Sequence, residues 1–102
     1  MDDCPPDPAP PEGSLVRELT ISNKKGLHAR ASARFVQTVQ QFNAEVKVIR
    51  CGEMVGGDSI MSLLTLAIPC GATIRVSASG REAKAALDAL EKLLAERFGE
   101  DD

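Results

Sequence analysis

The chain contains neither tryptophan nor tyrosine, and its three aromatic residues are all phenylalanine. Proteins that bind single-stranded nucleic acid use aromatic side chains for stacking and a basic surface for affinity. This chain of 102 residues has few aromatic side chains, and its net charge of −3 is the opposite of a basic surface. It also lacks an apolar run long enough to cross a membrane, and its first residues lack the basic and apolar pattern of a secretory signal. We therefore expect no nucleic-acid binding, no membrane insertion and a cytoplasmic location.

Cysteine and histidine are scarce as well, with three of the former and one of the latter. No cysteine is spaced from another, or from His28, in the manner of zinc ligands, and an odd number of thiols cannot all pair. We expect no metal site and reduced cysteines, with Cys4 an incidental residue; the alternative is a reactive, exposed thiol in a mobile tail. A glycine-rich phosphate-binding loop is also missing, so the sequence predicts no nucleotide or other cofactor.

Acidic residues are concentrated at the two ends of the chain. Seven of them stand there: Asp2, Asp3, Asp7, Glu12, Glu100, Asp101 and Asp102. Without these seven carboxylates, the rest of the chain would carry about +4. No acid occurs between Glu18 and Glu45, where four basic residues lie around His28: Lys24, Lys25, Arg30 and Arg34. The sequence therefore predicts a positive field around His28 although the protein as a whole is acidic.

A chain of this length has room for one domain with one core. Residues 1–13 hold five of the six prolines together with acids, which predicts a disordered or extended tail. The folded domain is expected over 14–99, and 100–102 form an acidic end. Within the domain, hydrophobic periodicity predicts the order β-α-β-β-α-β-α. The expected elements are a strand at 15–22, a helix at 29–42, a hairpin at 44–55, a short helix at 60–66, a strand at 72–78 and a helix from 83 to near Gly99.

The predicted strands alternate between apolar and polar residues, although Arg17 interrupts the apolar side of the first. Strands of this kind have one face to bury, and helices are available to cover it. We therefore predict the α+β class, an open-faced sandwich in which three helices cover one face of a four-stranded antiparallel sheet.

His28 stands where a loop is expected to become a helix. Helix N-termini expose unpaired N–H groups and the positive end of the dipole, so they favour anions and disfavour a protonated ring. A neutral imidazole nitrogen there is a nucleophile, and Arg30 offers a fork for phosphate oxygens. Without a second acid or base nearby, the residue is expected to take phosphate and pass it on rather than to catalyse a reaction. The alternative is a histidine with a surface or structural role.

Two motifs carry a resemblance to a known family. The run Gly26-Leu27-His28-Ala29-Arg30 and the run from Asp58 to Leu66 resemble the HPr phosphocarriers of the bacterial phosphotransferase system, over Ser14–Phe98. The resemblance implies that Enzyme I, charged from phosphoenolpyruvate, phosphorylates Nδ1 of His28, with Arg30 beside it. A IIA protein would then receive the phosphoryl group on a histidine. We expect the carrier to be a monomer and not an enzyme.

The second motif begins with Ser59, a favoured N-cap residue. The resemblance implies that Ser59 is a regulatory site for an HPr kinase/phosphorylase, although Asp58 stands where many relatives have lysine. The short helix that follows is apolar almost all round, so part of it is expected to be exposed for docking; ordinary core packing is the alternative. The expected docking residues are Ile60, Met61 and Leu64, with Lys24, Lys25 and Arg34 nearby.

The sequence departs from the carbohydrate carriers of the family after Arg30, where Ala31-Ser32 replaces a common proline. This variation is similar to the nitrogen-related branch. A second hypothesis is a regulatory binding module, in which the phosphorylation states of His28 and Ser59 mainly change which partner protein it binds. A third, an unrelated α+β domain that binds a small molecule or RNA, is disfavoured by the two motifs and the missing aromatics.

Overall fold

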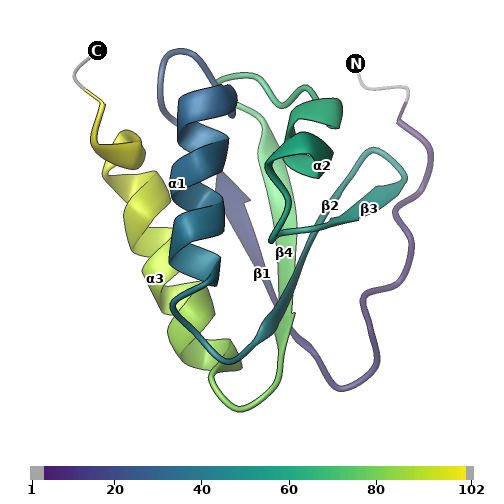
Figure 1. Ribbon diagram of the computed structural model, residues 1–102. Helices are drawn as coiled ribbons and strands as arrows, with labels where there is room; N and C mark the ends of the chain where they lie inside the picture. Colours follow the sequence, from purple (N-terminus) through teal and green to yellow (C-terminus); the bar gives the residue numbers. More distant parts are fainter. Residues whose placement is uncertain (1–3, 101–102) are drawn as a thin grey trace.

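The computed structural model describes residues 4–100 and confirms the predicted order of strands and helices (Figure 1). Its elements are β1 (Leu15–Thr20), α1 (Ala29–Val39), β2 (Glu45–Arg50), β3 (Glu53–Gly56), α2 (Ile60–Thr65), β4 (Thr73–Ser79) and α3 (Ala83–Ala95). A short 3-10 turn, Arg97–Gly99, follows α3. Both α1 and α3 end a turn earlier than the sequence predicted.

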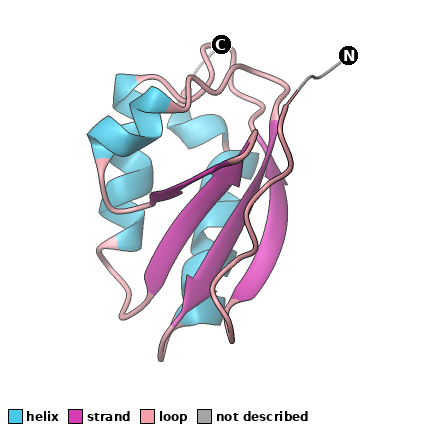
Figure 2. Ribbon diagram, turned by 90° about the vertical axis from the view of Figure 1, so that its right-hand side faces the viewer, coloured by secondary structure: helices cyan, strands magenta, loops and turns pink. Residues whose placement is uncertain are grey.

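The four strands form one antiparallel sheet in the order β1-β4-β2-β3. All three α-helices lie on one face of it (Figure 2). The predicted fold class is thus confirmed. In the core, α3 packs against β1 and β4, and α1 lies beside both α2 and α3. Phe35 of α1, Leu63 of α2 and Leu90 of α3 are fully buried, which gives each helix its own anchor in one shared core.

Arg17, which interrupts the apolar pattern of β1, has a structural explanation. Its guanidinium donates hydrogen bonds to the carboxylates of Asp88 and Glu91 on α3, at 2.8 Å each. These contacts raise the pKa of Arg17 and lower that of Asp88, chiefly through the hydrogen bond that the two share. Arg17 therefore joins the sheet to α3 at the surface instead of breaking the strand.

Of the tail that the sequence predicts to be disordered or extended, the structure describes residues 4–13; residues 1–3, and 101–102 of the acidic end, lie outside the described residues. Residues 4–11, here called the N-terminal strap, run in extended form across the sheet face opposite the helices (Figure 2). Cys4 forms a disulfide with Cys51 in the β2–β3 turn, whereas Cys70 is free and exposed. The prediction of three reduced thiols was therefore wrong for this pair. No spacing rule links the two cysteines: Cys4 reaches Cys51 because a sheet face supports the extended backbone of the strap.

Candidate functional site

The loop that carries His28 is pinned to the chain that leaves α2. The amide of Leu27 donates to the carbonyl of Ile68 at 2.9 Å. Gly26 has a φ of +71°, and a Cβ there would stand 2.5 Å from the same carbonyl oxygen. Only glycine combines a left-handed conformation with so close an approach between backbones. The position of His28 is thus coupled to the end of α2.

His28 is the N-cap of α1, as its place in the sequence predicted. Its backbone is extended, with φ −79° and ψ −174°, and its ring Nδ1 accepts a hydrogen bond from the amide of Arg30 at 3.2 Å. An N-cap side chain must offer an acceptor to the free amides of the first turn. The Nδ1 atom therefore carries a lone pair and lies at the positive end of α1.

The other ring nitrogen faces a carboxylate that the sequence did not assign to the site. Nε2 lies 2.6 Å from Oε2 of Glu100. The second oxygen of Glu100 accepts a hydrogen bond from the side-chain amide of Asn23 at 3.1 Å. Asn23 is fully buried and also donates to the carbonyl of Gly26 at 2.7 Å. Because Nδ1 is an acceptor, the proton of a neutral ring belongs on Nε2, where Glu100 accepts it. Glu100 and Asn23 together set the orientation and the tautomer of His28.

Glu100 reaches the site through the turn after α3. Three successive residues, Arg97, Phe98 and Gly99, have φ between 55° and 76°, and the Phe98 side chain is completely buried. Left-handed φ is unusual for non-glycine residues, so the turn depends on its surroundings for stability. The buried Phe98 supplies that anchor. No periodicity in the sequence signals this arrangement, which joins residues 72 positions apart.

The predicted basic residues lie on the surface around the histidine. Arg30 is exposed in the first turn of α1, and Lys24 and Lys25 are exposed in the loop before it. Arg34 is one turn further along, with its guanidinium beside Gly99. The His28 ring itself is partly open, with 28% of the side chain exposed. The structure therefore brings Arg30 and Arg34 to the same end of α1 as His28, with Glu100 as an acid in this basic region.

The α2 helix presents the other predicted site residues. Ser59 is its N-cap, and the Ser59 hydroxyl accepts a hydrogen bond from the amide of Ser62 at 3.2 Å. Met61 is 72% exposed and Ile60 is 38% exposed, while Leu64 is half-buried. These exposed apolar side chains form an open surface on α2. The helix itself lies next to α1 (Figure 1).

The described part of the chain has no group of three or more His, Cys, Asp or Glu side chains that could hold a metal ion. None of the helices seen between residues 4 and 100 has the length and hydropathy of a membrane span. The described site consists of the His28 imidazole, the Glu100 carboxylate, the Arg30 amide that donates to Nδ1, and the exposed basic residues around them.

A family model described as "PTS HPr component phosphorylation site" matches residues 15–96. The chain belongs to the HPr family of phosphocarriers. Phosphocarrier protein HPr of Cupriavidus necator is 45% identical to it over 86 residues, which make up 84% of this chain and 97% of that protein. Phosphocarrier protein NPr of Shewanella violacea is 37% identical over 86 residues, or 84% of this chain and 94% of that one.

The fold agrees with HPr structures as well. The crystal structure of HPr-C-His from Thermoanaerobacter tengcongensis matches with a TM-score of 0.82 and 35% identity, covering 86% of this chain and 99% of that chain. The resemblance inferred from the two motifs is therefore confirmed. The HPr match over 15–96 begins after Cys4 and ends before Glu100, so the strap and the partner of His28 lie beyond it.

Proposed function

We propose that this HPr-family protein carries phosphoryl groups on Nδ1 of His28, which receives them from phosphorylated Enzyme I and passes them to a histidine of a IIA protein. The observation that supports this proposal best is the pair of hydrogen bonds to the ring. Nε2 faces Glu100, and Nδ1 faces the amide of Arg30. A lone pair on Nδ1, at the end of a helix, is what an attack on phosphorus needs.

The transfer step follows from this geometry. The Nδ1 lone pair forms a bond to phosphorus while the bond from phosphorus to the donor histidine breaks, and the donor nitrogen keeps that electron pair. The His28 ring becomes positively charged and retains its proton on Nε2, where the Glu100 carboxylate stabilises the charge. The amide of Arg30, released from Nδ1, then becomes available to a phosphoryl oxygen, together with other first-turn amides. The exposed Arg30 guanidinium adds a charged donor for the remaining oxygens.

The same groups argue against an enzyme acting alone. Glu100 holds the ring nitrogen that does not attack, and Arg30 holds phosphate oxygens, so neither activates an acceptor. The groups that complete phosphoryl transfer in each direction would come from the partners. In this proposal the protein is a monomeric carrier that works in the cytoplasm.

The partners would dock on α2 and the basic residues around His28. Ile60, Met61 and Leu64 offer an apolar surface, and methionine adapts its shape to more than one partner. Lys24, Lys25 and Arg34 would attract acidic surfaces. The hydrogen bond from Leu27 to Ile68, with the close approach of Gly26 to the same carbonyl, keeps this surface in a fixed position relative to the phosphoryl group.

A regulatory role at Ser59 forms the second part of the proposal, with an HPr kinase/phosphorylase as the expected enzyme. Ser59 caps α2 directly before the exposed Ile60 and Met61, so a phosphate there would add negative charge at the edge of the docking surface. Asp58 already supplies one negative charge at this edge. If Ser59 phosphorylation mainly changes which proteins bind, the chain would act as a regulatory module and not chiefly in transport.

The test is incubation with phosphoenolpyruvate and a cognate Enzyme I. The wild type is expected to gain an acid-labile phosphate, His28→Ala is expected to gain none, and Ser59→Ala serves as a matched control that keeps the label. Label on His28→Ala, or none on the wild type, would contradict the carrier role. Transfer of that label to a IIA protein tests the second half-reaction.

A further inference from the structure

The N-terminal strap covers a part of the sheet that would otherwise face solvent. Ile49 of β2 points away from the helices, since its neighbours Val46 and Val48 point into the core, yet it is fully buried. The strap crosses this face (Figure 2), and an open groove of about 560 Å³ lies between the two. Cys4, Pro5 and Ile49 are among the residues that line it. The strap therefore accounts for the burial of Ile49, which the helices on the other face cannot cover.

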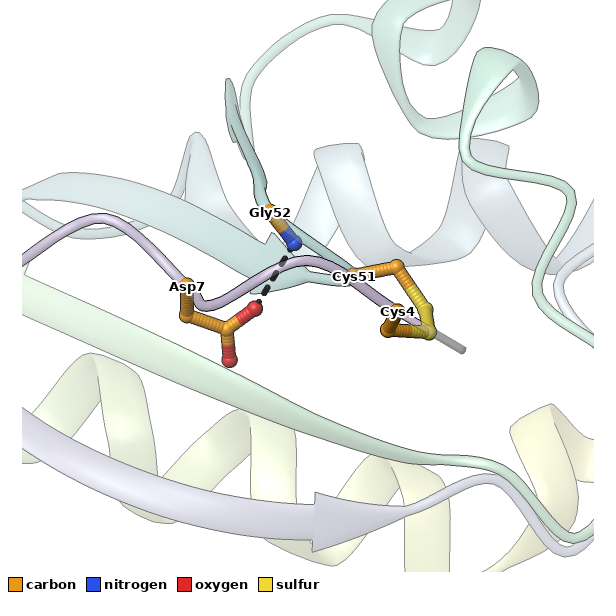
Figure 3. Close-up of a disulfide and its surroundings, with 4 residues drawn as sticks. All are labelled: Cys4, Asp7, Cys51 and Gly52. Atoms are coloured by element: carbon orange, nitrogen blue, oxygen red, sulfur yellow. Dashed lines mark hydrogen bonds between the residues drawn. A yellow bond between two sulfur atoms is a disulfide. The ribbon is translucent and has the colours of Figure 1, made fainter. Parts of the chain in front are cut away.

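Two polar contacts besides the disulfide join the strap to the sheet and to the β2–β3 turn. The amide of Gly52 donates to Oδ1 of Asp7 at 2.9 Å (Figure 3). Oδ2 of Asp7 lies 3.8 Å from Nη1 of Arg75. Both Asp7 and Arg75 are partly exposed, so water weakens their attraction. Five prolines, at positions 5, 6, 8, 10 and 11, remove the amides that would otherwise pair with a strand. Only the covalent bond from Cys4 to Cys51 holds the strap strongly.

The disulfide lies at the surface, where other thiols can reach it. Cys4 is exposed and Cys51 is partly exposed in the β2–β3 turn. Cys51 has a φ of 50° and Gly52 a φ of 80°, which places the pair in the two central positions of a tight hairpin turn. These positions favour asparagine, aspartate and glycine, so turn chemistry does not account for a cysteine at 51. The disulfide to Cys4, whose Cα atom lies 4.5 Å from that of Cys51, does account for the cysteine.

We propose that Cys4 and Cys51 form a redox-responsive pair that takes small-molecule disulfides and dithiols as its substrates, and that its state decides whether the strap is fastened over the sheet. In the oxidising direction, a cysteine thiolate attacks a disulfide such as oxidised glutathione and releases one thiol. The second cysteine then attacks the protein-bound sulfur and releases the other thiol. Two protein thiols lose two protons and two electrons, and the small disulfide is reduced to two thiols. A dithiol reverses the sequence.

The reduced state would present a different surface. Without the disulfide, the strap is held only by Asp7 and by contacts of its prolines, so it can leave the sheet face and expose Ile49. The disulfide and the two polar contacts of Asp7 join the strap to the sheet and the β2–β3 turn, and His28 takes part in none of them, so the phosphoryl site is expected to persist in both states. In a reducing cytoplasm, the location proposed above, disulfides that form are typically redox-sensing or catalytic. Redox state would thus change the sheet face without changing the chemistry at His28.

The test equilibrates the full chain in buffers of graded glutathione ratio and measures free thiols by alkylation and mass spectrometry. Cys4 and Cys51 are expected to lose their thiols together, with loss of two hydrogen atoms from the protein and no glutathione retained. Cys70→Ser is the matched control and is expected to keep this transition, whereas Cys51→Ser removes it. Cleavage of the strap by a protease, and exchange of the Gly52 amide, are both expected to be several-fold faster in the reduced protein.

Three outcomes would overturn the proposal. One is that Cys4 and Cys51 stay reduced in fully oxidised glutathione or pair with Cys70. Another is a disulfide that no glutathione ratio opens in the folded protein, which would make it a permanent structural bond. The third is strap cleavage and Gly52 exchange at equal rates in the oxidised and reduced forms. None of these readouts involves phosphoryl transfer, so they stand independently of the proposed carrier function.

Discussion

Nε2 of His28 lies 2.6 Å from Oε2 of Glu100, although the two residues are 72 positions apart in the chain. This contact, together with the hydrogen bond from the Arg30 amide to Nδ1, leaves Nδ1 as the nitrogen with the available lone pair. The nucleophile of the proposed transfer is thus chosen by the fold, through a turn that also buries Phe98.

Replacing Glu100 by glutamine should slow phosphorylation of His28 by Enzyme I. The substitution keeps the shape but removes the negative charge that stabilises a positively charged phosphohistidine ring. Loss of a hydrogen bond to a charged group typically costs about 1.5–3 kcal/mol, so we expect a fall of roughly tenfold or more in the rate. Glu96→Gln, at an exposed position after α3, is the control and should behave like the wild type. Equal rates for Glu100→Gln and wild type would show that the charge of Glu100 does not assist phosphorylation of His28.

Replacing Gly26 by alanine should destabilise the protein and disturb the His28 loop. The new Cβ would meet the carbonyl of Ile68 at 2.5 Å in addition to the strain of a φ of +71°. Gly13→Ala is a matched control, because Gly13 has a φ of +81° but a Cβ added there would have nothing within 4 Å. Left-handed strain alone costs about 1–3 kcal/mol. Urea unfolding should give a larger loss for Gly26→Ala than for Gly13→Ala; equal losses would show that the close approach is unimportant.

The cap at Ser59 should have a measurable effect on stability. Removing the hydroxyl in Ser59→Ala leaves the amide of Ser62 without its acceptor and should lower the free energy of unfolding by about 1 kcal/mol. Ser59→Asp offers another acceptor at the same place and should recover most of the loss. If the two variants unfold at the same urea concentration, the side chain at position 59 contributes nothing to the stability of the fold as a cap.

The Arg17–Asp88 contact should make stability depend on pH in the acidic range. The hydrogen bond from Arg17, and next the one from Lys84, lower the pKa of Asp88 in the folded state. A carboxyl with a lowered folded pKa contributes stability above its unfolded pKa of about 3.9 and loses it as the pH falls through the folded value. As the pH falls below about 4, the free energy of unfolding should therefore fall less for Asp88→Asn than for the wild type. The difference should be small because the Arg17–Asp88 pair is exposed to water. Glu53→Gln is the control; identical pH profiles for wild type and Asp88→Asn would contradict this.

The sequence predicted those parts of the fold that depend on local pattern. The periodicity of apolar residues identified the strands and helices, and His28 and Ser59 were correctly expected at helix starts. Glu100 was assigned only to an acidic end, because its contact with His28 depends on the turn around Phe98. Cys4 was expected to be unpaired in a disordered or extended tail, since its pairing with Cys51 depends on a sheet face that supports this segment. Both omissions concern contacts between distant residues, for which no spacing rule exists.

The most direct test of the carrier role is nuclear magnetic resonance of the chain labelled with ¹⁵N in its histidine ring, before and after treatment with phosphoenolpyruvate and Enzyme I. The unphosphorylated ring should be the tautomer with its proton on Nε2, and the phosphorylated protein should show coupling of phosphorus to Nδ1 of His28. A phosphoryl group on Nε2, or phosphorylation that leaves the His28 ring signals unchanged, would contradict the account.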